Sequence, residues 1–224
     1  MPLTRPPAHF DGTPNRNALG RGTCLWRVHT RAYPAHAFKP VPSDLLFGGA
    51  RFDSTDADPY PYWYAALDET TAVAETLLRD LHPDERGTRA LTRTHVEDRK
   101  LSGLILTQNL NLVSLLTGLD LAAVAQDAWL VTSPGHDYPQ TRAWAHWLRG
   151  HAPWAHGLIW SSLRNPGRPA ITLFGDRCAA DFGADYENSL LHEVPELAVD
   201  LDDKAGIEWL NGLLEPYRVA VPVP

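Results

Sequence analysis

The stretch that most constrains the fold is 62–75, YWYAALDETTAVAE, because its pattern changes abruptly from that of a buried strand to that of a helix. Asp68 stands at the change and is predicted to cap the helix, with Glu69 in the first turn beside the positive end of the helix dipole. Glu75 falls at the edge of the apolar arc of this helix. It is therefore either a solvated residue paired with Arg79 or a carboxylate that faces a cleft.

Further elements follow from short aromatic or β-branched segments and from helix start signals. Strands are predicted at 24–30, 50–54, 62–67, 157–162, 170–174 and 217–221, and less distinctly at 100–107 and 111–116. Helices are predicted at 68–81, 119–130, 139–149 and 203–214. These strands and helices do not alternate in a strict βαβ order, so we predict an α+β domain.

The length of 224 residues suits one domain with extensions. Residues 1–22 contain four prolines and no periodic apolar pattern, so we expect an extended or disordered N-terminal arm, with the domain proper at 23–224. Residues 83–130 are interpreted as an insertion within that domain, and its charged first part, 83–100, is expected at the surface. Cys24 and Cys178 are too few for a disulfide framework and are expected to be buried.

The net charge of −7 and the scattered arginines argue against direct nucleic-acid binding. They are compatible with a small anionic ligand, because two or three arginines can grip phosphate groups in an acidic protein. No apolar run approaches the ~18 residues of a membrane span, and the N-terminus lacks the apolar centre of a signal peptide. We therefore expect a cytoplasmic protein without membrane contact. A homo-oligomer is possible, and the sequence does not decide whether the chain self-associates.

Several common site motifs are absent from the sequence. The acidic stretch DSTDADPY lacks the calcium-loop order, and the histidines at 146, 151 and 156 do not share a helix face as zinc ligands would. There is no P-loop, no Rossmann fingerprint and no GxSxG elbow. No metal site and no bound cofactor are therefore predicted.

Four separated segments carry a combined pattern. Arg27 lies in LWRVHT, Arg51 in GGARFDS, Tyr64 and Glu75 in YWYAALDETTAVAE, and Ser162 in GLIWSSLRNPGRPAITLF. Each motif alone is weak, but their content and order resemble the RES domain, the toxin component of RES–Xre toxin–antitoxin pairs. The resemblance covers about residues 24–174.

The resemblance implies an ADP-ribosyltransferase-like fold, with mixed or antiparallel sheets flanked by helices, and NAD as a substrate. Glu75 would stabilise positive charge on the ribose while the nicotinamide bond breaks, as in glycoside hydrolysis. Arg27 and Arg51 would bind the pyrophosphate, Tyr64 would stack on nicotinamide, and Ser162 would hydrogen-bond ribose or carboxamide. An Xre-type antitoxin on a separate chain is the implied partner, and phosphate is a second substrate if the bond is cleaved by phosphorolysis.

Three hypotheses remain open at this point. The first is an NAD glycohydrolase or phosphorylase that acts as an intracellular toxin by depleting NAD. The second is an ADP-ribosyltransferase that modifies a protein. The third is a catalytically silent binding domain, motivated by Phe52-Asp53 and Trp160, which stand where the family more often has Trp-Asn and tyrosine.

Overall fold

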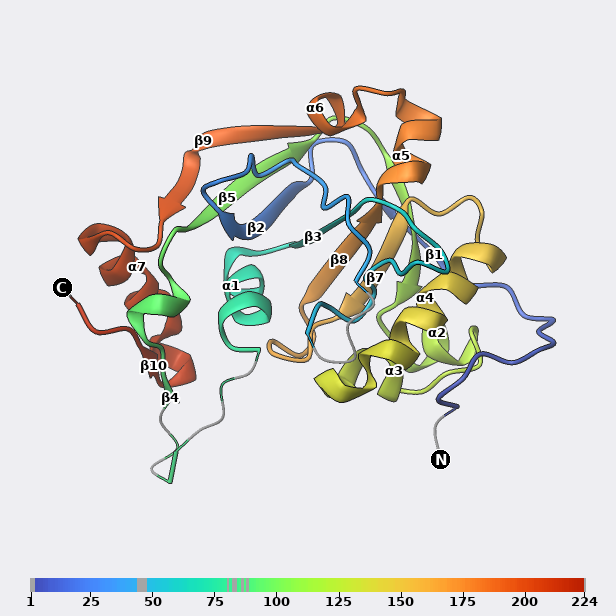
Figure 1. Cartoon of the computed structure of the whole chain (residues 1–224), viewed down its shortest axis with the longest axis horizontal. Coiled ribbons are helices and arrows are strands. Elements are labelled where there is room, and N and C mark those ends of the chain that lie inside the picture. Colours follow the sequence, from blue (N-terminus) through green and yellow to red (C-terminus); the bar gives the residue numbers. More distant parts are fainter. Residues whose placement is uncertain are drawn as a thin grey trace.

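The computed structural model describes residues 3–43, 48–79, 81, 84, 85, 87 and 89–223. A curled eight-stranded mixed sheet forms its centre, with helices on both faces (Figure 1). The strands are β1 (Arg16–Leu19), β2 (Cys24–Thr30), β3 (Tyr62–Ala66), β4 (Arg89–Ala90), β5 (Arg99–Leu106), β6 (Leu110–Leu115), β7 (Gly157–Ser161), β8 (Pro169–Phe174), β9 (Leu191–Asp200) and β10 (Val219–Ala220). The helices are α1 (Glu69–Leu77), α2 (Gly118–Ala122), α3 (Trp129–Thr132), α4 (Tyr138–His151), α5 (Gly175–Phe182), α6 (Tyr186–Leu190) and α7 (Lys204–Leu214). The predicted α+β class is confirmed.

The main sheet has the strand order β1-β6-β7-β8-β3-β2-β5-β9. Strands β6 and β7 run parallel, and the other neighbours in this sheet run antiparallel. One junction is weak: β2 and β3 pair only at Trp26 and Ala66, whereas β2 pairs with β5 along its whole length. The two strands therefore separate beyond this contact, and an opening can form between them.

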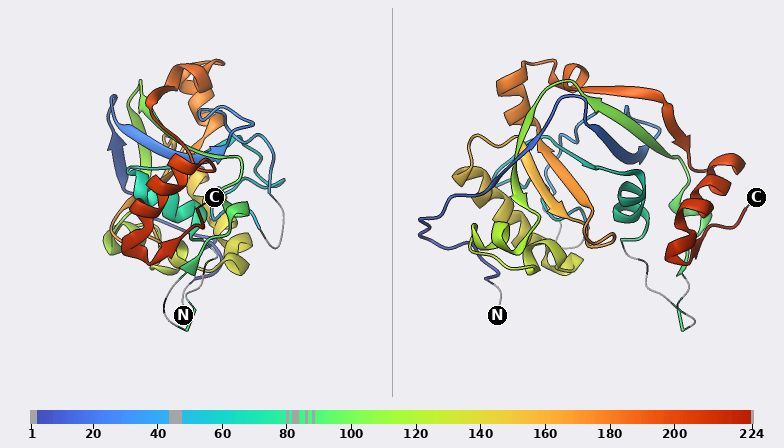
Figure 2. Two further views of the ribbon diagram at one scale, coloured as in Figure 1. Left: turned by 90° about the vertical axis from the view of Figure 1, so that its left-hand side faces the viewer. Right: turned by 180° about the vertical axis from the view of Figure 1, so that it is seen from behind.

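The sheet is buried on both faces, which explains the continuous apolar runs of β7 and β8. Trp144 and Leu148 of α4 pack on one face together with Leu158 of β7. Cys178 of α5 packs on the opposite face, in the same cluster as Ile159. A third cluster joins α1 and α7 to the curled β2–β5 end of the sheet, and α7 lies at the opposite end of the molecule from α4 (Figure 2).

Most of the predicted elements are present with shifted ends. The strands expected at 24–30, 62–67, 100–107, 111–116, 157–162 and 170–174 correspond to β2, β3, β5, β6, β7 and β8. The helices expected at 68–81, 139–149 and 203–214 correspond to α1, α4 and α7. Helix α1 ends at Leu77, and residue 80 of the predicted range lies outside the described residues. The strand expected at 217–221 is reduced to Val219–Ala220.

Two predicted elements are wrong. Residues 50–54 form no strand: the carbonyl groups of residues 50–52 accept hydrogen bonds from side chains, and that of Ser54 accepts from the backbone N–H of Ser43, which belongs to no strand. The helix expected at 119–130 is divided into α2 and α3, because Ala125 has a left-handed φ of 56° that a continuous helix does not allow.

Two burial expectations need correction, and the structure adds detail to the expected N-terminal arm and insertion. Leu91 and Val96 are fully buried, so the described part of 83–100 does contribute to the core. Cys178 is buried as expected, whereas Cys24 is only half-buried. Within the expected N-terminal arm, residues 16–19 form β1 and pair with β6, and within the expected insertion β5 and β6 are interior strands of the sheet.

Candidate functional site

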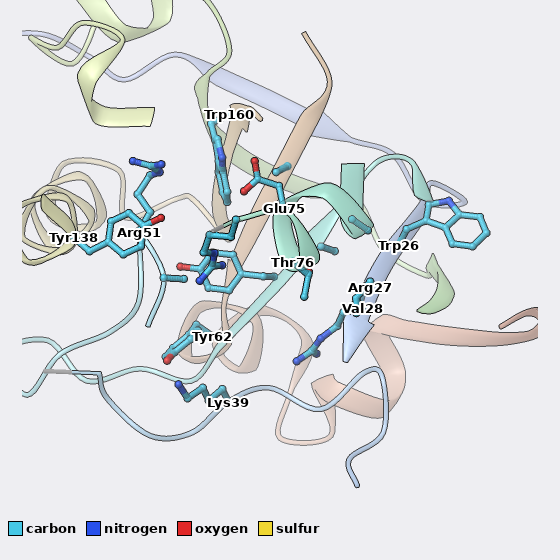
Figure 3. Close-up of a pocket in the computed structure, with 16 residues that line it drawn as sticks. Trp26, Arg27, Val28, Lys39, Arg51, Tyr62, Glu75, Thr76, Tyr138 and Trp160 are labelled. Atoms are coloured by element: carbon cyan, nitrogen blue, oxygen red, sulfur yellow. The ribbon is translucent and has the colours of Figure 1, made fainter. Parts of the chain in front are cut away.

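A pocket of about 220 Å³ opens where β2 and β3 separate, with α1 along one side (Figure 3). Its walls combine four cationic side chains, one carboxylate and several aromatic rings. The lining residues are Trp26, Arg27, Val28, Lys39, Ala50, Arg51, Tyr62, Tyr64, Ala65, Ala72, Glu75, Thr76, Arg79, Tyr138, Trp160 and Ala170. Four of the five residues selected from the sequence are among them, and Ser162 is not.

Helix α1 places Glu75 at the pocket. As predicted, Asp68 is the N-cap residue, and its side chain accepts a 2.8 Å hydrogen bond from the backbone N–H of Thr71. Val73, Ala74 and Leu77 are buried, and Glu75 lies half-buried at the edge of that face. Glu75 is therefore held by a helix that is fixed at its start and packed along its length.

Ser162 stands behind Glu75 and not at the pocket surface. Its hydroxyl donates a 2.5 Å hydrogen bond to Oε1 of Glu75, and its side chain is 2% exposed. The same hydroxyl oxygen accepts hydrogen bonds from the backbone N–H groups of Arg164 and Asn165, at 3.1 and 2.9 Å. Ser162 thus connects the end of β7 to the carboxylate, whereas the sequence predicted direct contact with the ligand.

The loop after Ser162 makes two further hydrogen bonds, one to α1 and one to the segment that follows α1. The side-chain amide of Asn165 donates a 2.8 Å hydrogen bond to Oγ1 of Thr71. The guanidinium of Arg164 donates to the backbone carbonyl of Arg79. The relative position of Glu75 and Ser162 consequently depends on contacts along the whole side of the helix.

Arg51 enters the pocket from the opposite wall, beside Tyr138 (Figure 3). Its Nη1 donates to the backbone oxygen of Ser133 at 3.0 Å and to the hydroxyl of Ser133 at 2.5 Å, and its guanidinium lies 5.2 Å from the centre of the Tyr138 ring. Burial lowers the pKa of Arg51, while the charge of Glu75 acts in the opposite direction. Glu75 and Arg51 therefore influence each other electrostatically across the pocket.

Part of the Arg27 guanidinium is hydrogen-bonded to backbone carbonyl groups. Its Nη1 donates to the carbonyl oxygens of Ala35 and Ala37, at 2.9 and 2.8 Å, and its guanidinium lies 5.3 Å from the centre of the Trp63 ring. Burial lowers its pKa to about 10, so it stays charged at neutral pH. Arg27 both lines the pocket and holds the segment that leads to Lys39.

Tyr64 lines the pocket with its ring and holds the opposite loop with its hydroxyl. The hydroxyl oxygen accepts a 3.0 Å hydrogen bond from the backbone N–H of Phe52. The ring lies edge-on to Trp160, with 6.1 Å between the ring centroids. Burial raises the pKa of the hydroxyl well above its usual range, so it remains neutral.

The RES domain family model matches residues 24–201, which is more than half of the chain. The chain belongs to the RES domain family. The fold is also similar to a chain in the crystal structure of the M. tuberculosis MbcT-MbcA toxin–antitoxin complex, with a TM-score of 0.51, 15% sequence identity, and coverage of 90% of this chain and 91% of that chain. No curated protein matches the sequence significantly.

The two positions that the sequence resemblance marked as unusual, Phe52-Asp53 and Trp160, lie against each other. Phe52 and Trp160 are both buried, and their rings make an edge-to-face contact with 5.1 Å between centroids. Asp53 is also buried, and its Oδ2 accepts a 2.8 Å hydrogen bond from the backbone N–H of Ala50. Of these three residues only Trp160 lines the pocket, and Phe52 packs against Trp160.

Sequence reasoning missed several polar residues of the pocket, among them Lys39, Arg79 and Tyr138. Arg79 had a usable signal, because it lies one helical turn from Glu75. No ion pair joins these two residues within the described part of the chain; Arg79 Nη1 instead donates a 2.9 Å hydrogen bond to the carbonyl of Gly49. Lys39 and Tyr138 carry no sequence signal, since each reaches the pocket from an irregular segment or a helix start.

No three His, Cys, Asp or Glu side chains gather into a metal site anywhere in the described part of the chain. Within the same described residues, no helix has the length and apolar content needed to cross a membrane.

Proposed function

We propose that this RES domain cleaves the nicotinamide–ribose bond of NAD, by hydrolysis or by phosphorolysis. The observation that carries the proposal is the hydrogen bond from Ser162 to Glu75, because it fixes one oxygen of a pocket carboxylate between the arginines expected to bind a pyrophosphate. A dinucleotide has the matching groups: a glycosidic carbon that becomes positive and a pyrophosphate that is negative.

The charge distribution in the pocket supports an anionic substrate. Arg27, Lys39, Arg51 and Arg79 face one carboxylate, that of Glu75, although the whole chain has a net charge of −7. All the hydrogen bonds that the described residues make with the guanidinium groups of Arg27 and Arg51 involve Nη1. Nε and Nη2 of each arginine are thus the donors that would bind the phosphate oxygens.

The size of the pocket indicates how NAD would lie. Its volume of about 220 Å³ is smaller than the roughly 300–1,000 Å³ of typical small-molecule sites, so it encloses only part of a dinucleotide. We place the nicotinamide and its ribose inside, near Glu75, and the adenosine outside the mouth. Nicotinamide leaves as a neutral ring, so no strong general acid is required, and Glu75 serves to stabilise the oxocarbenium-like transition state.

The assay is release of nicotinamide from NAD by the purified chain, with and without inorganic phosphate. Glu75→Gln keeps the size of the side chain and removes its charge, and we expect it to lower kcat by at least ~10²-fold with an unchanged circular dichroism spectrum. ADP-ribose as product identifies hydrolysis, and ADP-ribose-1″-phosphate identifies phosphorolysis. Equal rates in the two proteins, or no release by the wild type, would refute the proposal.

A second incubation distinguishes NAD degradation from the second open hypothesis, transfer of ADP-ribose to a protein. Adenine-labelled NAD is incubated with the chain and a cell lysate, and protein is precipitated afterwards. Label that stays in small molecules supports NAD degradation, whereas label in the precipitate of the wild type but not of Glu75→Gln supports protein modification. Tight NAD binding without either product would identify a silent binding domain.

We further propose that the chain acts as a toxin that is neutralised by a separate Xre-type antitoxin. Membership of the RES family and the likeness to a chain of a toxin–antitoxin complex support this role. Expression of the wild-type chain alone in a bacterial host is expected to lower the cellular NAD concentration and stop growth. Glu75→Gln at the same protein level serves as the control, and growth arrest by both proteins would contradict a role through NAD.

A further inference from the structure

The loop that carries Arg51 is held by side chains from outside the loop. Each of four consecutive backbone carbonyl groups accepts a hydrogen bond from such a donor. These bonds are Arg142 Nη2 to Gly48 (2.5 Å), Arg79 Nη1 to Gly49 (2.9 Å), Arg142 Nε to Ala50 (3.1 Å) and Thr141 Oγ1 to Arg51 (2.6 Å). The path of the backbone into Arg51 is thus set by these donors.

Arg142 contributes most to this arrangement. It belongs to α4, its side chain is 1% exposed, and it is not among the residues that line the pocket. Besides its bonds to Gly48 and Ala50, its Nη1 donates a 2.8 Å hydrogen bond to the carbonyl of Ser43. Arg142 therefore acts on the loop without reaching the ligand.

The loop depends on such support because its glycines do not define a conformation by themselves. Gly48 and Gly49 have φ angles of 94° and 70°, a region that glycine enters freely and leaves equally freely. The planar guanidinium of Arg142 presents several donors in a fixed geometry, which a lysine ammonium on a flexible stem does not reproduce. One rigid group can therefore fix carbonyls on both sides of Gly49.

We propose that Arg142 is a positioning residue for the reaction: it sets the direction in which Arg51 enters the pocket, and thereby the grip of Arg51 on the pyrophosphate. This inference rests on the proposed cleavage of NAD. Because Arg51 would bind the phosphates equally in the ground state and the transition state, loss of its position raises KM and leaves kcat nearly unchanged. A purely structural role would instead lower the folded fraction and leave the KM of the remaining enzyme unchanged.

The test compares the wild type with Arg142→Lys in NAD cleavage. We expect KM for NAD, and the inhibition constant of ADP-ribose, to rise about tenfold in parallel, with kcat changed by less than about twofold. Thr141→Val is a second variant of nearly the same shape. It removes the hydroxyl that donates to the carbonyl of Arg51 at 2.6 Å, and at 3.1 Å to that of Tyr138 within the same helix, and it is expected to raise KM as well. It keeps the test valid if Arg142→Lys fails to fold.

Arg149→Lys is the matched control. Arg149 is also a buried arginine of α4, but it pairs with Asp58 and Asp176 and makes no hydrogen bond to 48–51. We expect this variant to lower the melting temperature without a change in KM.

A double variant tests whether Arg142 acts through Arg51. If it does, Arg51→Ala with Arg142→Lys has the same KM as Arg51→Ala alone, because the second change has nothing left to misplace. Additive effects on KM would overturn the inference, as would an unchanged KM in both Arg142→Lys and Thr141→Val. A wild type that releases no nicotinamide overturns the proposed function and this inference with it, whereas normal wild-type activity with an unchanged KM in the variants overturns this inference alone.

Discussion

The hydroxyl of Ser162 and the carboxylate of Glu75 lie 2.5 Å apart, oxygen to oxygen, although 87 positions separate the residues in the chain. The serine is buried behind the carboxylate, so the two residues form one unit in which only Glu75 faces the pocket. A carboxylate that accepts such a hydrogen bond has a fixed orientation. This is the arrangement expected of a group that stabilises a positive transition state.

Ser162→Ala is expected to reduce catalysis more than substrate binding. Loss of the hydroxyl frees Oε1 of Glu75 to rotate, so we expect kcat for NAD cleavage to fall about tenfold or more with a small change in KM. Ser161→Ala is the control, because the hydroxyl of Ser161 accepts from the backbone N–H of Gly167 and does not contact Glu75. A rise in KM with unchanged kcat would instead show that Ser162 binds the substrate directly.

Tyr64→Phe separates the two roles of this side chain. The variant keeps the ring at the pocket but leaves the backbone N–H of Phe52 without its acceptor, at a cost of about 1–3 kcal/mol for a buried group. We expect the free energy of unfolding to fall by that amount and KM for NAD to rise, because Phe52 follows Arg51 in the held loop. Wild-type stability and kinetics would indicate that the aromatic ring alone matters. Urea unfolding and steady-state kinetics measure both effects.

Gly49→Ala is expected to destabilise the protein strongly. A non-glycine residue at φ 70° costs roughly 1–2 kcal/mol, and a Cβ at this position would collide with Arg142 Nη2, the Ser43 hydroxyl and Asp53 Oδ2. Gly167→Ala is the matched control, since Gly167 has a φ of 84° and open space around it, so it pays only the conformational cost. If urea unfolding shows the same loss of unfolding free energy in both variants, the loop around Gly49 can rearrange to accept the extra methyl group.

Stability is expected to fall in mild acid because of His29. Nδ1 of its ring lies 2.9 Å from the carbonyl oxygen of Thr30 and 3.1 Å from that of Tyr33, so Nδ1 carries the proton and Nε2 accepts from the hydroxyl of Ser102. Burial lowers the pKa of His29, and the nearby charge of Arg27 adds to that effect. The folded state therefore keeps this histidine neutral to a lower pH than the unfolded chain does.

The sign follows from proton binding. Below the unfolded-state pKa of about 6.5, the unfolded chain binds a proton that the folded chain does not, so the free energy of unfolding decreases as the pH falls toward the lowered folded pKa. Above about pH 6.5 both states keep the histidine neutral, so its contribution to the free energy of unfolding no longer changes with pH. Melting temperatures of the wild type and His29→Gln between neutral pH and mild acid provide the measurement. An equal pH slope in both proteins would assign the acid sensitivity to other groups.

Local patterns in the sequence were sufficient to predict the secondary structure of the regular segments. The N-cap at Asp68, the apolar face of α1 and the apolar runs of β7 and β8 are encoded in adjacent residues, and they form as predicted. The order of the motifs also identified the family. Glu75 was placed at the rim of a buried face because helical geometry alone fixes that position.

The remaining features depend on distant contacts. The segment 50–54 has the composition of a strand, but side-chain donors from α4 and from Tyr60 bind the carbonyl groups of residues 50–52 and hold them as a loop. Lys39 and Tyr138 reach the pocket only because β2 and β3 separate beyond one residue pair. Ser162, chosen from the family pattern as a ligand contact, proved to support Glu75 from behind.

The sequence by itself determined most of the regular helices and strands around the site, and its resemblance to the RES domain selected the carboxylate that lies at the pocket. Only the tertiary structure decided which groups face the ligand and which hold those groups in place. The physical reason is range: helix capping and apolar periodicity act between residues a few positions apart, whereas the direction of Arg51 and of Glu75 depends on hydrogen bonds between segments that meet only after the sheet has formed.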